Sequence, residues 1–99
     1  MIHVIAIITA KPRQRSAVLE IFNANLPAVR AEAGCIEYGP VIDVDGADPA
    51  FGPDTFVVVE KWESMAALKA HAAAPHMAAY GEKTKHLVAA RAVHVLTSA

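Results

Sequence analysis

The sequence predicts a single α+β domain of the ferredoxin-like class, in which an antiparallel sheet carries its helices on one face. With 99 residues, the chain is long enough for one hydrophobic core and too short for two. Segments of strand and helix character follow one another in the order βαββα(α)β, which two layers accommodate as this fold. Apolar residues make up 55% of the chain, a high share for a small domain. We therefore expect one domain over residues 1–99, with part of its apolar surface facing a partner subunit.

Three segments have the composition of strands. Ile2 to Ala10 is apolar and β-branched with no turn residue inside, which predicts a buried strand. Cys35 to Val44 follows, and Gly39-Pro40 within it indicates a bulge or an edge position, because proline cannot donate to a ladder. Thr55 to Trp62 has a period of two and should pair with the preceding segment as a long hairpin. This period places four side chains on one face: Phe56, Val58, Glu60 and Trp62.

The remaining segments read as helices and a last strand. Apolar residues recur at helical spacing from Val18 to Val29, and Gly34 follows as a stop signal. Ser64 can cap a helix that carries Met65, Leu68, His71 and Ala72. Pro75 fits the first turn of a further helix, which we expect to include Met77, Tyr80, Leu87 and Val88. Ala92 to Thr97 should close the chain as a final strand.

The strand composition predicts a homodimer. Helices can cover only one face of the sheet, yet the first and third strands are apolar on both faces. A second copy of the same sheet would bury the uncovered face symmetrically. The loop from Asp45 to Asp54, which is rich in turn-forming residues, is expected to shape a pocket mouth or the dimer rim.

Charge and hydropathy exclude several classes of partner. The net charge is −1 and the basic residues are dispersed, so we expect no nucleic-acid partner. The longest purely apolar run is Val4 to Ile8, far short of a bilayer span, so no membrane partner is expected. The N-terminus lacks the charged and small-residue features of a signal peptide, and the single Cys35 fits a reducing compartment. We expect a cytoplasmic protein.

No metal or cofactor motif is present. His71 and His76 are five residues apart, whereas metal-binding helices use a spacing of four. The scattered glycines form neither a phosphate-binding loop nor a dinucleotide fingerprint. We therefore expect no metal, no nucleotide and no flavin, and the chemistry must come from ordinary side chains.

Two side chains are candidates for proton handling. Glu60 shares a strand face with Phe56 and Trp62, and burial among these rings would raise the pKa of its carboxyl group. The alternative is a Glu60 at the sheet rim, paired with a lysine or arginine. His71 lies one turn after Leu68 and can face inward toward Trp62, as a general base or as a hydrogen-bonded structural histidine.

Two stretches resemble the antibiotic biosynthesis monooxygenase family. Arg30 to Tyr38 is similar to the family's Arg-Ala-Glu-Pro-Gly-Cys helix end and its following strand with tyrosine, with Ala33 in place of proline. Glu60 to Ser64 is similar to its E-x-W-x-S motif. The series continues with Ala67-Leu68, His71 and Pro75-His76-Met77, where Ala74 and Met77 replace serine and phenylalanine. With the opening strand included, the resemblance covers almost the whole chain.

The resemblance implies a dimeric α+β barrel of the quinol-monooxygenase-like branch, which oxidises phenolic or quinol substrates with dioxygen and no cofactor. Such an enzyme needs only a base, orientation and a water-poor pocket, because a deprotonated quinol is a good electron donor to dioxygen. The residues that this resemblance puts forward as catalytic are His71, Glu60 and Trp62. The residues that we expect to bind substrate are Tyr38, His76, Phe22, Phe56 and Tyr80. Tyr38 can present its hydroxyl group to the ligand or be a core residue.

Other functions on the same fold stay open. Related proteins isomerise small phosphorylated ketones, which is proton transfer without dioxygen, and a non-catalytic binding dimer is a third possibility. The haem-degrading branch uses a histidine where this chain has Gly81 and an asparagine where it has Ile5. Haem is therefore not expected.

Overall fold

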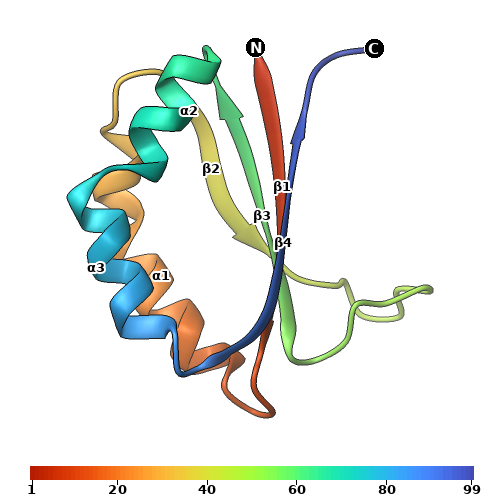
Figure 1. Cartoon of the computed structure of the whole chain (residues 1–99). Helices are drawn as coiled ribbons and strands as arrows, with labels where there is room; N and C mark the ends of the chain where they lie inside the picture. Colours follow the sequence, from red (N-terminus) through yellow and green to blue (C-terminus); the bar gives the residue numbers. More distant parts are fainter.

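A computed structural model describes residues 1–99, and its elements follow the predicted order (Figure 1). The four strands form one antiparallel sheet in the order β2-β3-β1-β4, and all three helices lie on one side of it. The predicted ferredoxin-like α+β fold is thus confirmed. The elements are β1 (Ile2–Ala10), α1 (Arg15–Arg30), β2 (Cys35–Val41), β3 (Thr55–Trp62), α2 (Met65–Ala72), α3 (Pro75–Thr84) and β4 (Val88–Leu96).

Strand register divides the sheet into an inner face, which the helices cover, and an outer face. Val4 lies opposite Glu60 and Ala6 opposite Val58, and both pairs belong to the inner face. There the sheet packs against α1 through Val18, Phe22 and Val29, all of them buried. The outer face carries the alternate residues, with Ile5 opposite Val59 and Ile7 opposite Val57. The period-two pattern of β3 therefore places its side chains as predicted.

β2 differs from its prediction in length and in the place of its bulge. The strand ends at Val41 rather than Val44, because the chain then turns into a loop that Asp43 holds. The Asp43 carboxylate accepts hydrogen bonds from the backbone N–H groups of Phe51 at 3.0 Å and Gly52 at 2.9 Å. The register shift lies between Cys35 and Glu37 and not at Gly39-Pro40. The proline is accommodated because β2 is an edge strand.

The boundary between α3 and β4 also differs from the prediction. The helix ends at Thr84, so Leu87 and Val88 are not helical. Leu87 donates its N–H to the Thr84 carbonyl in a turn, and Val88 already pairs with Ala10 of β1. β4 thus begins at Val88, four residues before the predicted start at Ala92. Pairing with β1 outweighs the weak strand propensity of the alanine-rich start of β4.

The turn after α1 depends on a glycine. Gly34 has a φ of +83°, and a Cβ atom there would lie 2.6 Å from the Cβ of Ala67 on α2. The Gly34 carbonyl also accepts the N–H of Glu63 at 2.9 Å. At the start of α2, Ser64 accepts the N–H of Ala67 at 3.1 Å, which confirms the predicted cap.

The outer face and the long loop lie away from the helices. The 42–54 loop extends on the side of the sheet opposite the helical layer (Figure 1). None of its residues lines the main cavity described below, so it does not form a pocket mouth in this chain. Its place at a dimer rim stays a prediction. No helix combines the length and the apolar character that crossing a bilayer requires.

Candidate active site

A cavity of about 570 Å³ lies between the inner face of the sheet and helices α2 and α3. This volume is typical of small-molecule sites, which run from about 300 to 1,000 Å³. Aliphatic side chains from β1 and β3 form much of the wall, including Val4, Ala6 and Val58. Seven polar or charged side chains interrupt this apolar lining: Tyr38, Glu60, His71, Tyr80, Thr84, Lys85 and Arg91.

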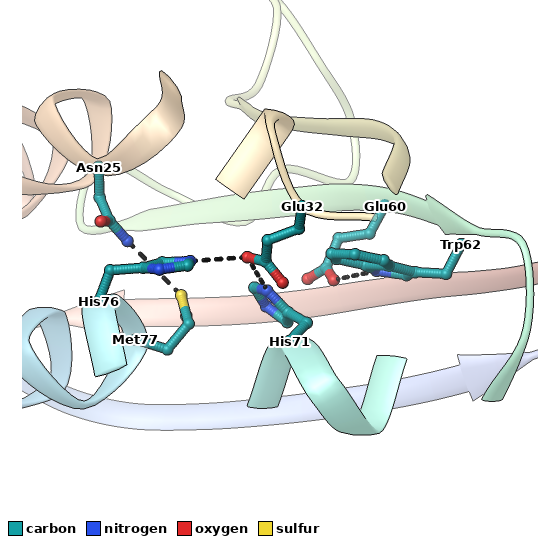
Figure 2. A network of polar contacts seen from close by, with 7 residues as sticks. All are labelled: Asn25, Glu32, Glu60, Trp62, His71, His76 and Met77. Atoms are coloured by element: carbon teal, nitrogen blue, oxygen red, sulfur yellow. Dashed lines mark hydrogen bonds and ion pairs between the residues drawn. The ribbon is translucent and has the colours of Figure 1, made fainter. Parts of the chain in front are cut away.

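His71 is held by a carboxylate (Figure 2). Its Nδ1 atom lies 2.9 Å from Oε2 of Glu32, just beyond the end of α1. An ionised carboxylate only accepts hydrogen bonds, so a neutral imidazole in this contact carries its proton on Nδ1 and has a free lone pair on Nε2. Nε2 has no hydrogen-bond partner in the chain, and the side chain lines the cavity. This is the arrangement of a general base with an orienting carboxylate.

Glu32 also contacts a second histidine. Nε2 of His76, in the first turn of α3, lies 2.7 Å from the same Oε2 atom (Figure 2). The His76 side chain is 29% exposed and lines a separate hollow of about 400 Å³ between α1 and α3. It does not line the main cavity, although sequence reasoning placed it among the substrate contacts. Glu32 therefore connects a histidine on the cavity wall with one at the surface.

Glu60 and Trp62 form a second polar pair on the inner face of β3. The indole Nε1–H donates to Oε1 of Glu60 at 2.9 Å. Burial raises the pKa of Glu60, while the hydrogen bond from Trp62 and the nearby His71 act in the opposite direction. This direction agrees with the prediction, and no lysine or arginine pairs with Glu60 as the rim alternative required. Trp62 itself is fully buried and packs on the His71 ring, with 4.6 Å between centroids.

The predicted aromatic contacts form one cluster, only part of which reaches the cavity. Phe22 stacks on Tyr38 with 5.5 Å between ring centroids, and it meets Tyr80 edge-on. These three rings line the cavity. Phe56 packs edge-on against Phe22, is fully enclosed and does not line it. Burial raises the pKa of Tyr38 far above its usual range, so its hydroxyl group stays protonated and is available as a donor.

Glu32 was not among the predicted site residues. Its one signal in the sequence is its place in the Arg30 to Tyr38 stretch, between a helix end and Gly34. Nothing in that position indicates a histidine partner, because His71 is 39 residues further along the chain. The inward orientation of His71 toward Trp62, by contrast, follows from helical spacing and is observed.

Comparison with known proteins identifies the family. The family described as "Antibiotic biosynthesis monooxygenase" matches residues 1–83, which is most of the chain and includes every residue of the Glu32 and Glu60 networks. The chain belongs to the antibiotic biosynthesis monooxygenase family. The resemblance in its sequence motifs is thereby confirmed.

Individual known proteins are similar to this chain over most of their length. "Probable quinol monooxygenase YgiN" of Escherichia coli K12 is 43% identical over 89 residues, which is 86% of each chain. Rv0793 from Mycobacterium tuberculosis has a TM-score of 0.82 at 30% identity, covering 99% of this chain and 94% of that one. PA3566 from Pseudomonas aeruginosa has a TM-score of 0.85 at 26% identity, covering 99% of this chain and 93% of that one. The architecture of this chain is thus that of solved proteins.

Proposed function

We propose that this protein is a cofactor-independent monooxygenase that oxidises a small quinol or polyphenol with dioxygen. The observation that carries the proposal is the His71–Glu32 pair at the wall of a largely apolar cavity, with Nε2 of the histidine unpartnered. Such a base needs no cofactor to activate a phenolic hydroxyl group. The similarity to a probable quinol monooxygenase supports the substrate class.

The first step is removal of a phenolic proton by Nε2 of His71. Glu32 stabilises the resulting imidazolium through its hydrogen bond to Nδ1, as the orienting carboxylate does in other dyads. The quinolate passes one electron to dioxygen, and the semiquinone and superoxide then combine at a ring carbon. Loss of water leaves a hydroxyquinone, so one oxygen atom enters the ring and the other leaves as water. The quinol supplies all the electrons, and no external reductant is needed.

Other side chains hold the reacting groups in place. Tyr38 remains protonated and can donate to the quinolate oxygen, while Phe22 and Tyr80 supply flat apolar surface for the ring. Glu60 lines the cavity and can hold a proton there, because burial favours its neutral form. Trp62 acts as a positioning residue, since it donates to Glu60 and packs on His71 without reaching the cavity.

The proposal includes a homodimer. The centre of the outer face is aliphatic, with Ile5, Ile7, Val57 and Val59 from the two middle strands and no helix over them. A second copy packed on this face would bury these side chains symmetrically and leave the cavity of each subunit on its own inner face. Each subunit would then carry a complete set of site residues.

Oxygen uptake with a panel of hydroquinones tests the function. We expect His71→Ala to lower kcat by about 10²–10⁴-fold, the usual contribution of a general base. His86→Ala is the matched control, because His86 is exposed and lines neither the main cavity nor the smaller hollow. Equal rates of oxygen uptake in the wild type and His71→Ala would show that His71 is not the general base. Turnover without oxygen consumption would instead identify a proton-transfer enzyme such as an isomerase.

A further inference from the structure

The cavity has a second polar end, formed by β4. Arg91 lines the cavity and lies opposite Ile8 of β1, whereas Glu60 lies opposite Val4. Four residues along a strand correspond to about 13 Å, so the backbones at Arg91 and Glu60 are far apart along the sheet. A single ring bound against His71 and Glu60 would not extend to the backbone of Arg91. The space between the two ends is lined mainly by apolar side chains.

The guanidinium group of Arg91 has no partner within the chain. Arg15 donates to the carbonyl of Thr55 at 3.1 Å, and Arg30 donates to the carbonyl of Tyr38 at 3.1 Å. Both of these guanidinium groups are therefore used in hydrogen bonds within the chain. Arg91 makes no hydrogen bond and no ion pair. Lys85 lines the same end but is paired with Glu82 at 2.9 Å. Arg91 is therefore the unpaired cation of this cavity.

An unpaired guanidinium on a ligand cavity has a preferred chemistry. Its planar array of N–H donors matches a carboxylate bidentately, and a charge-assisted hydrogen bond of this kind is stronger than a neutral one. The positive charge also acts on the polar groups of the cavity, since Arg91 lowers the pKa of both Glu60 and Tyr80 against the effect of burial. Arg91 lines the same cavity as the catalytic candidates Glu60 and His71.

We propose that the cavity takes an aromatic acid, with its phenolic ring at His71 and Glu60 and a carboxylate arm at Arg91. The oxidation of the ring rests on the proposed function, whereas recognition of the carboxylate does not. The volume of about 570 Å³ fits such a two-part ligand. The site thereby selects a quinol that carries an acidic side chain over the unsubstituted quinol.

Binding of a pair of matched probes tests the recognition without any turnover. The probes are 3-phenylpropanoate and its amide, which differ in charge and have no hydroxyl group to oxidise. By calorimetry we expect the wild type to bind the acid at least about fivefold more tightly than the amide, and Arg91→Gln to reduce this ratio to about twofold or less. Lys69→Gln, which removes one exposed positive charge on α2 away from the cavity, should keep the wild-type ratio.

Equal binding of the two probes to the wild type would overturn the proposal, and so would an acid preference that survives in Arg91→Gln. Oxygen uptake with 3-(2,5-dihydroxyphenyl)propanoate and its amide forms the second arm, because the two rings have similar electronic character. A higher kcat/KM for the acid, lost in Arg91→Gln, supports the proposal. Acid preference in binding with no oxygen uptake from either quinol supports carboxylate recognition and contradicts the monooxygenase function, so the two failures are distinguishable.

Discussion

The two faces of the sheet are built from the same strands and differ in almost every property. On the inner face, β2 and β3 present Tyr38, Glu60 and Trp62, all buried and joined to one another by rings or hydrogen bonds. On the outer face, the middle strands present aliphatic side chains such as Ile5 and Val59. Residues that are neighbours in sequence therefore have different proposed roles, catalysis on the inner face and assembly on the outer face. The period of two along a strand makes this division possible.

The largest expected effect is the loss of stability when a charge is placed on the inner face of β3, and the same charge on the outer face is the comparison. Val58→Asp would bury an unpaired carboxylate on the inner face, which costs about 3–5 kcal/mol and is a large part of a typical domain's stability. We expect this variant to be unfolded or nearly so by circular dichroism. Val59→Asp, one residue further and on the outer face, should cost the fold of the single subunit only about 1 kcal/mol through strand propensity and packing.

The same outer-face variant tests assembly. In sedimentation velocity we expect the wild type to run as a dimer at micromolar concentration and Val59→Asp to run as a folded monomer, because the substitution would place a charged carboxylate in the proposed aliphatic interface. A wild type that is monomeric at this concentration would contradict the proposed use of the outer face. A dimeric Val59→Asp variant would show that the dimer interface lies elsewhere on the protein.

A pair of glutamates, one beside the cavity and one on the exposed surface of β2, tests whether the site depends on the Glu32 contact. Glu32→Gln should lower kcat by about 10–100-fold with little effect on unfolding, because the variant can hold His71 in place but cannot stabilise its charged form. Glu37→Gln removes an exposed carboxylate whose contact is with Lys61 at 3.8 Å, and it should leave kcat within about twofold of the wild type. Equal losses in both variants would show that the effect is one of overall charge and not of the dyad.

The smallest effect concerns stability against pH. Burial raises the pKa of Glu60, so the folded chain binds this proton more tightly than the unfolded chain does. The stabilising contribution is fully present at acid pH and is lost as the pH rises through the folded-state pKa. We therefore expect Glu60→Gln to raise the Tm at about pH 8 more than at about pH 4, where the native carboxyl group is already neutral. A Tm difference that is larger at acid pH would contradict the burial of this group.

The fold could be predicted from the sequence because its signals are local. The alternation in Thr55 to Trp62, the cap at Ser64 and the proline at the start of α3 each specify their element without reference to distant residues. The errors fall where local signals are ambiguous. The alanine-rich segment at Val88 fits a helix as well as a strand until its pairing with β1 decides.

The site was predictable only in part, for a related reason. His71 and Glu60 each have a recognisable orientation on their own element, so they could be named from spacing and from their apolar neighbours. Glu32 and Arg91 become site residues only through tertiary packing. Glu32 contacts His71, which is 39 residues away, and Arg91 reaches the cavity because β4 pairs with β1. No sequence pattern within one segment predicts a contact between residues so far apart in the chain.

The turn at Gly34 bears on how closely the two halves of the dyad can approach. Residue 34 follows Glu32 by two positions, and the Cβ position there would already overlap a methyl group of α2, the helix that carries His71. Because Gly34 has no side chain, the turn that carries Glu32 can pack directly against the helix that carries His71. Any larger residue at this point would have to push one helix away from the other, and the bond between the two partners would lengthen although neither had been changed.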